Sequence, residues 1–181
     1  MRRGILYARI DDVAVGSLHV FCTHLSAIQS GLKYDGSYGD WDGENARHVE
    51  DLIGFVAEKV PANGKVLILG DLNTSPAAAG VSPSVPANYA KFAPAGFADP
   101  FLVGPNAACT FCNDNPLVSA SDTGVDATLD HILTRGLDKR VLVTRRLDQQ
   151  IELDVPVPGG GSEKRQSALS DHYALHAVIT Q

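Results

Sequence analysis

A strand–helix–strand pattern constrains the fold of this chain most strongly. From Glu44 to Val60, apolar residues recur at spacings of three and four and charged residues fill the other face, which predicts an amphipathic helix. The sequence "PANG" ends this helix, and "KVLIL" at 65–69 then has the character of a buried strand. Alternating apolar residues predict two earlier strands, at 4–10 and 17–25, joined across "DDVAVG". A helix between strands indicates a layered α/β architecture.

The second half of the chain adds strands and long loops. Alternating or apolar runs predict strands at 129–135, at 141–147 after the turn "GLDK", and at 172–180. The proline-rich stretch 74–100 is predicted to form loops with one short helix near Tyr89–Phe92, and 155–167 a surface loop. No internal repeat or boundary divides the sequence, so we expect residues 1–181 to form a single domain.

Net charge and hydropathy limit the partners of this chain. The formal net charge is −6, from 15 Lys and Arg against 21 Asp and Glu, which disfavours broad nonspecific binding to nucleic acid. No apolar run approaches the roughly 20 residues that cross a bilayer. Arg9 and Asp11 interrupt the first apolar stretch too early for a signal peptide, so this sequence indicates no export signal and fixes no localisation.

Three cysteines leave the thiol chemistry open. An odd number excludes complete pairing within the chain. Cys109 and Cys112, in "CTFC", have the spacing of a disulfide, a redox pair or half of a zinc site, but no second pair completes a zinc site. Cys22 lies in an apolar strand and is expected to be a small core residue.

Polar side chains gather where predicted strands end or begin. They are His24 in "THL", Asp71 and Asn73 in "GDLNTSP", Asp130 in "LDHIL", and Asp171 and His172 in "LSDHYAL". Loops at one edge of a layered sheet converge, so these groups can share a pocket. Carboxylates bind hard divalent cations and histidines transfer protons, which is what phosphoester hydrolysis requires. Each motif alone also fits an ordinary turn, a helix cap or a paired strand histidine.

In this order, the motifs resemble the C-terminal part of the endonuclease/exonuclease/phosphatase superfamily. That group includes deoxyribonuclease-like enzymes, abasic-site endonucleases, inositol polyphosphate phosphatases and neutral sphingomyelinases. The resemblance extends from the strand before His24 to the last predicted strand. It implies a four-layer α/β sandwich around two packed sheets. It also implies metal-dependent hydrolysis of a phosphodiester, with Mg²⁺, or else Mn²⁺ or Ca²⁺, as the cofactor.

The resemblance also implies a role for each matching residue. Asp71 and Asn73 would contact the scissile phosphate and the attacking water. His172 would be the general base or a phosphate contact, and Asp130 would orient its ring. His24 would stabilise the pentacovalent transition state or assist the leaving group.

One departure from the family concerns the metal. Asp171 would lie near the divalent cation, but family members carry their principal metal ligand, a Glu, in a further N-terminal portion. None of Glu44, Glu50 and Glu58 matches that Glu. The chain is therefore expected to be the C-terminal part of the domain. An exposed sheet face would then favour homo-oligomers. His131, next to Asp130, would face the other side of its strand and be structural.

The substrate class follows from weaker resemblances. The segments around "THL" and "CTFCNDNPL" resemble secreted sphingomyelinase-like members more than abasic-site nucleases, so a phospholipid headgroup is the first expectation and nucleic acid the second. A noncatalytic fragment that acts as an interaction module is the alternative from another class. The aromatic residues of the loop 26–43 are expected to pack that loop, with lipid binding as the alternative; they are Tyr34, Tyr38 and Trp41.

Overall fold

A four-stranded sheet in the order β1-β2-β3-β4 forms the centre of the protein. Its strands are β1 (Ile5–Ile10), β2 (Leu18–His24), β3 (Lys65–Asp71) and β4 (Asp130–Arg135). The central pair β2 and β3 is parallel, and the two outer pairs are antiparallel. The computed structural model describes residues 3–11, 16–29, 31–78, 80–104, 107–118, 126–137, 141–147 and 149–179.

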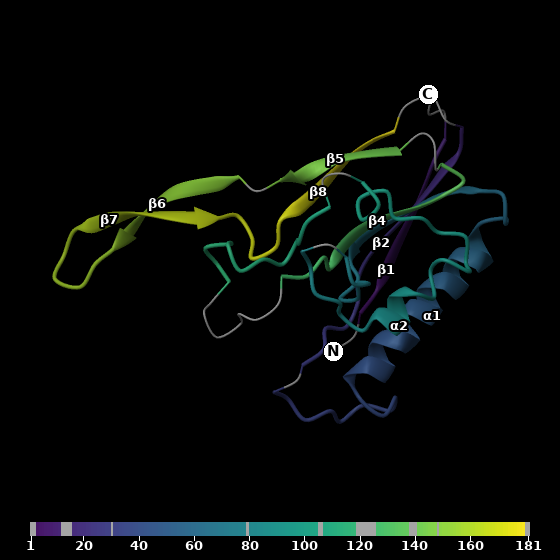
Figure 1. The fold of residues 1–181 in the computed structure, drawn as a ribbon, viewed down its shortest axis with the longest axis horizontal. Coiled ribbons are helices and arrows are strands. Elements are labelled where there is room, and N and C mark those ends of the chain that lie inside the picture. Colours follow the sequence, from purple (N-terminus) through teal and green to yellow (C-terminus); the bar gives the residue numbers. More distant parts are fainter. Residues whose placement is uncertain are drawn as a thin grey trace.

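One long helix covers one face of this sheet and connects its two parallel strands (Figure 1). The helix α1 spans Trp41–Lys59, and the side chain of its N-cap residue Asp40 accepts a hydrogen bond from the Gly43 N–H at 2.7 Å. A short helix, α2 (Pro86–Tyr89), contacts α1. The buried contact between helix and sheet includes Phe21, Val49, Leu52, Val56 and Ile68. The predicted layered α/β arrangement is therefore confirmed.

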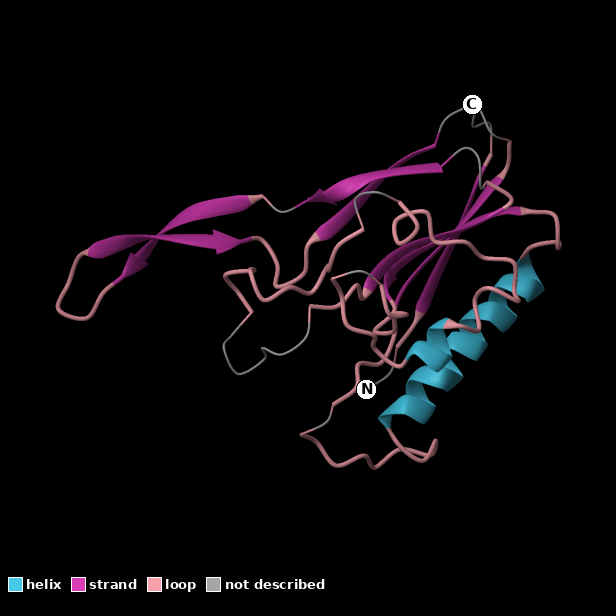
Figure 2. Ribbon diagram, viewed as in Figure 1, coloured by secondary structure: helices cyan, strands magenta, loops and turns pink. Residues whose placement is uncertain are grey.

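Two smaller pairs of strands extend from the central sheet. β5 (Val141–Leu147) pairs with β8 (Ala174–Ile179), and β8 packs on the face opposite α1 through Leu175 and Ala177. β6 (Gln150–Pro156) and β7 (Ser162–Ala168) form a hairpin that projects away from the rest of the molecule (Figures 1 and 2).

One expectation for the second half of the chain was wrong. The predicted surface loop 155–167 is a hairpin with a short turn, because the backbone ladder with β6 forms although β7 is polar on both faces and carries no hydrophobic period. The strands predicted at 129–135 and 141–147 are present as β4 and β5, and β4 pairs with β3 whereas β5 pairs with β8. Residues 138–140 of the predicted turn "GLDK" lie outside the described residues.

Part of the sheet face opposite α1 exposes apolar side chains. Leu6 and Ile10 of β1 are 70% and 43% exposed. Cys22 pairs with Leu6 across the strands and is also exposed, so the prediction that it belongs to the core was wrong. Its neighbours Phe21 and Thr23 are the buried residues, because alternate side chains of a strand point to opposite faces and only that face meets α1.

The end of β3 requires glycine. Gly70 has a φ of 138°, and a Cβ added there would lie 1.9 Å from the carbonyl oxygen of Thr23 on β2. Real Cβ atoms do not approach a carbonyl so closely, so only glycine lets β2 and β3 meet where Asp71 follows. The glycine of "LILGDLN" is therefore a condition for the strand pairing at this edge.

We predict that Gly70→Ala destabilises the fold by about 3 kcal/mol or more, because it adds both a backbone clash and an unfavourable φ. The matched control is Gly54→Ala, an exposed position inside α1 with nothing within 4 Å of an added Cβ. That change should stabilise the protein by about 0.5–1 kcal/mol. Urea unfolding of the two variants measures both effects, and equal stabilities would contradict the strain at Gly70.

Candidate active site

Strand pairing places three predicted site residues in one row. His24 and Asp71 are the last residues of β2 and β3 and lie directly opposite each other. Asp130 is the first residue of β4 and lies opposite Asp71, because β4 runs antiparallel. The Nε2 atom of His24 lies 3.3 Å from Oδ2 of Asp71. The register of the sheet thus makes neighbours of residues that are far apart in the sequence.

His172 joins this row from the segment before β8. Its Nδ1 lies 2.8 Å from Oδ2 of Asp130 and 4.0 Å from Oδ2 of Asp71. Its backbone N–H donates to Oγ of Ser170 at 3.1 Å, which fixes the turn that presents the ring. A carboxylate that holds Nδ1 sets the orientation of an imidazole and leaves Nε2 for a ligand. We call His24, Asp71, Asp130 and His172 the His–Asp row.

The close carboxylates shift two pKa values. The pKa of Asp71 is raised, first by burial and then by the negative charge of Asp130, against the lowering effects of His172 and of the Asn73 N–H. The pKa of His172 is raised chiefly by its hydrogen bond to Asp130, against the effect of burial, and the charges of Asp71 and Asp171 add to the increase. The row therefore favours holding a proton.

Asn73 holds the turn that follows β3. Its Nδ2 donates to the carbonyl of Leu25 at 3.0 Å, and its backbone N–H donates to Oδ1 of Asp71 at 2.9 Å. The residue is buried and has a φ of 50°, a conformation that asparagine adopts more readily than most residues. In this geometry Asn73 positions the Asp71 carboxylate.

A buried asparagine on α1 supports the same turn, and sequence reasoning missed it. Asn45 is fully buried, and its Nδ2 donates to the carbonyls of Ser26 at 2.9 Å and Leu72 at 3.1 Å. These carbonyls belong to the loops after β2 and β3, so one side chain joins both. The available signal was a polar residue four positions before Val49, on the apolar stripe of the helix.

His131 faces away from the row, as expected for a structural residue. Its Nδ1 lies 2.7 Å from Oδ2 of Asp99 and its Nε2 lies 2.9 Å from the carbonyl of Thr74. A carbonyl only accepts, so Nε2 of His131 donates to Thr74, and Oδ2 of Asp99 also accepts a hydrogen bond from the Tyr89 hydroxyl. This buried contact anchors the turn after Asn73 from the sheet face that α1 covers, since His131 lies on the same side of β4 as Leu133 of the helix-facing core.

Asp171 lies at the rim of the site. It is exposed, and its Oδ1 accepts a hydrogen bond from Oγ of Ser170 at 3.3 Å. Asp71 and Asp130 have the chemistry that a hard cation prefers, but each already lies close to a histidine. Within the described ranges, no group of three His, Cys, Asp or Glu side chains is arranged to hold a metal ion. These residues therefore do not form a complete metal site by themselves.

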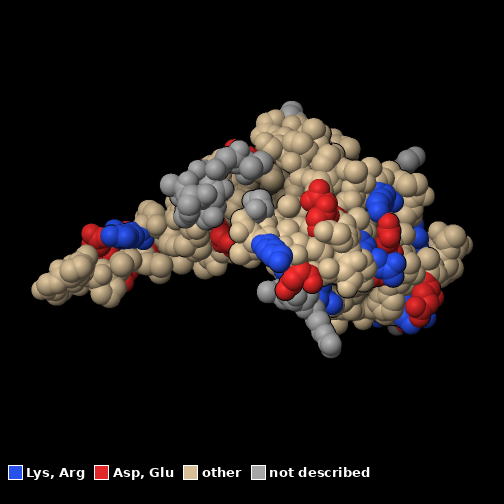
Figure 3. All heavy atoms as spheres, turned by 90° about the horizontal axis from the view of Figure 1, so that it is seen from below, with Lys and Arg blue, Asp and Glu red and all other residues tan. Residues whose placement is uncertain are grey.

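Charged and aromatic side chains outside the row have structural partners. Lys164, on the projecting hairpin, lies 3.0 Å from Glu152 and 3.4 Å from Asp154. On the face in Figure 3, basic and acidic side chains are interspersed, so this face offers no broad basic surface. In the loop before α1, the rings of Tyr34 and Trp41 meet edge to face, with centroids 5.1 Å apart, in agreement with the expectation that they pack the loop.

A known family matches nearly the whole chain. A sequence model of the Endonuclease/Exonuclease/phosphatase family matches residues 8–172, a range that includes every residue of the His–Asp row. A search of curated proteins finds no match.

Solved structures share the fold at low sequence identity. Sphingomyelinase C from Streptomyces griseocarneus is 21% identical with a TM-score of 0.64, and the alignment covers 99% of this chain and 58% of that one. A beta toxin variant from Staphylococcus aureus with bound magnesium ions is 20% identical with a TM-score of 0.67, covering 98% and 58%. An AP endonuclease from Archaeoglobus fulgidus is 16% identical with a TM-score of 0.56, covering 98% and 79%. This chain thus spans less than three fifths of the first two proteins.

We predict that Asp130→Asn lowers the pKa of His172 toward that of a free imidazole, about 6.5. The change removes the carboxylate that favours the charged ring, so the ring loses its proton at lower pH. The raised pKa also means that this pair stabilises the fold below about pH 6.5 and that the stabilisation is lost as pH rises through the pKa of His172. Imidazole NMR titration of His172 in the wild-type protein and in the variant measures the pKa. An unchanged His172 pKa in the variant would contradict the assignment.

Proposed function

Because the chain belongs to the endonuclease/exonuclease/phosphatase family, we propose that it hydrolyses a phosphodiester at the His–Asp row. The observation that carries this proposal is the 2.8 Å contact between Nδ1 of His172 and the Asp130 carboxylate, beside the paired His24 and Asp71. Such a row supplies an oriented imidazole, a second histidine and a partly desolvated carboxylate within one small region. Attack of water on phosphorus needs a proton acceptor and nearby positive charge.

His172 is the proposed general base. Asp130 holds Nδ1, so Nε2 takes the proton from the attacking water, and the resulting imidazolium is stabilised by Asp130 and Asp71. The raised pKa of His172 makes it a stronger base but requires a pH at which the ring is neutral. The same ring, once protonated, can donate to a phosphoryl oxygen.

The other row residues have complementary proposed roles. Asp71, positioned by Asn73, contacts the attacking water or the phosphate, and a protonated Asp71 can donate to a phosphoryl oxygen. The side chain of His24 is 54% exposed, which suits contact with a substrate arriving from solvent. As an imidazolium it would stabilise negative charge on phosphorus or on the leaving oxygen.

A phospholipid headgroup is the proposed substrate, in a sphingomyelinase-like reaction. Its support is the resemblance of the motifs and the fold shared with sphingomyelinase C. Hydrolysis of nucleic acid is the second possibility within the family, since an AP endonuclease shares the fold as well. The net charge of −6 and the interspersed surface charges disfavour it. Among the described residues, no helix has the length and apolar character needed to cross a bilayer.

A divalent cation, Mg²⁺ or else Mn²⁺ or Ca²⁺, is the proposed cofactor. Such an ion neutralises charge on a phosphate when bound. Asp171 is the proposed ligand, and the described side chains would provide only part of the coordination. That shortage favours the second candidate function, a noncatalytic module that retains the row as part of an interaction surface.

We predict that the chain hydrolyses bis-p-nitrophenyl phosphate and sphingomyelin with added Mg²⁺, and that His172→Ala lowers kcat by about 10²–10⁴-fold because the general base is lost. His48→Gln, on α1, is the matched control and should keep the activity. Chelation by EDTA tests the cation. A folded protein that cleaves neither substrate, nor single-stranded or duplex DNA, would favour the interaction module.

We also propose that two copies associate through the sheet face that carries Leu6, Ile10 and Cys22. These side chains leave apolar area in water that a second copy would bury. We predict that Leu6→Lys shifts the protein toward monomer in multi-angle light scattering, because it places a charge in that contact. Leu153→Lys is the matched control, since Leu153 is 43% exposed on the hairpin. A wild-type protein that is monomeric at all concentrations would contradict association.

A further inference from the structure

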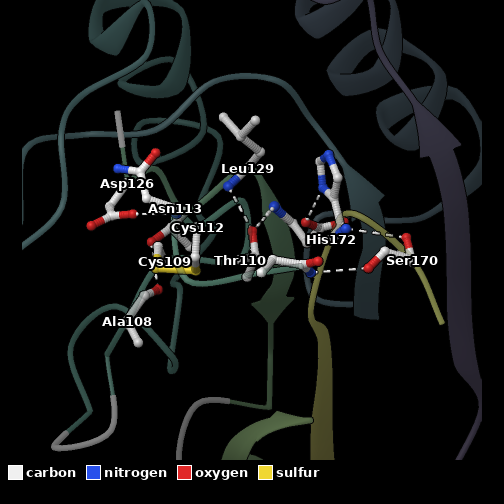
Figure 4. The surroundings of a disulfide bond; sticks show 12 residues. Ala108, Cys109, Thr110, Cys112, Asn113, Asp126, Leu129, Ser170 and His172 are labelled. Atoms are coloured by element: carbon white, nitrogen blue, oxygen red, sulfur yellow. Dashed lines mark hydrogen bonds and ion pairs between the residues drawn. A yellow bond between two sulfur atoms is a disulfide. The ribbon is translucent and has the colours of Figure 1, made fainter. Parts of the chain in front are cut away.

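A disulfide, whose surroundings Figure 4 shows, encloses two residues that contact the segments carrying Asp130 and His172. Cys109 and Cys112 are bonded, with their Cα atoms 5.5 Å apart. This resolves the alternatives that the "CTFC" spacing left open, and Thr110 and Phe111 are the residues inside the loop.

Thr110 holds the beginning of β4. Its Oγ1 accepts hydrogen bonds from the backbone N–H groups of Leu129 at 2.9 Å and Asp130 at 3.0 Å. Its backbone N–H donates to the carbonyl of Ala127 at 2.9 Å. The residue is completely buried, so these bonds are shielded from water. A single hydroxyl therefore fixes the backbone from which the Asp130 carboxylate projects.

The other side of the enclosed pair contacts the His172 segment. The carbonyl of Thr110 accepts the N–H of Tyr173 at 2.8 Å, and Phe111 forms a β-bridge with His172. The rings of Phe111 and His172 are tilted against each other, with centroids 5.2 Å apart. The segment thus bonds to both chain segments whose side chains meet in the 2.8 Å contact of the row.

We propose that Thr110 and Phe111 are positioning residues for the Asp130–His172 pair, and that the Cys109–Cys112 bond keeps them in place. The proposal rests on the proposed function, because it assigns catalytic value to that pair. Among the described residues, no strand ladder joins the start of β4 to the segment that carries His172, and both contact the enclosed residues Thr110 and Phe111 instead. Reactions that depend on such alignment lose rate steeply when a group moves by about 1 Å.

A consequence is that thiol reductants lower the activity. A dithiol gives two electrons and two protons to the Cys109–Cys112 bond, which becomes two thiols, and the dithiol itself becomes a disulfide. The four-residue loop then gains conformations that it lacks when closed. Loss of alignment should reduce kcat and leave KM nearly unchanged, because His172 and Asp130 act on the reacting atoms rather than on the bulk of the substrate.

The first test compares Thr110→Val, which removes the hydroxyl at nearly constant shape, with Thr110→Ser, which keeps it. Amide hydrogen exchange at Leu129 and Asp130 should be at least about tenfold faster in the valine variant and near the wild-type rate in the serine variant. The kcat for bis-p-nitrophenyl phosphate should fall about tenfold or more in the valine variant and recover in the serine variant. Wild-type exchange in Thr110→Val, or equal losses in both variants, would overturn the proposal.

The second test isolates the disulfide. A Cys22→Ser background removes the free thiol, which could otherwise exchange with the disulfide or pair with a second copy. In this background, reduction of the Cys109–Cys112 bond by dithiothreitol should lower kcat and speed exchange at Asp130. Adding Cys109→Ala and Cys112→Ala should give the same low kcat, now insensitive to the reductant. If the chain cleaves no phosphodiester but exchange at Asp130 responds as stated, the positioning stands and the proposed function fails. If the chain is active and indifferent to reduction and to Thr110→Val, the positioning fails.

Discussion

The parallel pairing of β2 with β3 is the constraint on which the rest of the site depends. It places His24 beside Asp71, and the antiparallel addition of β4 then brings Asp130 to the same edge. Because side chains alternate along a strand, a shift of one residue in this register would turn the Asp71 carboxylate to the other face of the sheet. The helix α1, Gly70 and the buried amide of Asn45 all serve to hold that register.

Two carboxylates side by side at a sheet edge, here Asp71 and Asp130, repel each other unless a bound proton or a nearby positive charge offsets the repulsion. Burial and mutual repulsion raise the pKa of Asp71, and the neighbouring imidazoles relieve part of that cost. The hydrogen bond to Asp130 and the charges of both carboxylates in turn favour a protonated His172. A second layer, made of the His131–Asp99 pair and the Thr110 hydroxyl, contains no group of the row itself. These groups hold the backbone at Thr74 and Asp130 instead, so the side chains of the row remain available to contact a ligand.

The sequence carried enough information for the central layers but not for their surroundings. Periodicity located α1 and the strands of the central sheet, since these elements bury one face. It failed for the β6–β7 hairpin, whose polar strands bury little, and for Cys22, because alternation does not say which face of a sheet is covered. The positions of strand ends predicted His24, Asp71 and Asp130 as site residues. The hydrogen bond from the Asp130 N–H to Thr110 depends on tertiary contacts, which the spacing of residues in the sequence does not reveal. The roles of these residues stay predictions.

The projecting hairpin is a sheet separate from the one that carries the His–Asp row. The two can therefore accept substitutions at different rates during evolution. Its strands pair with each other, outside the ladder that sets the His–Asp row. Substitutions or length changes at its turn, 157–161, therefore leave the register of the central sheet untouched. The length and charge of this hairpin can therefore vary during evolution without a change in the strand register that forms the His–Asp row.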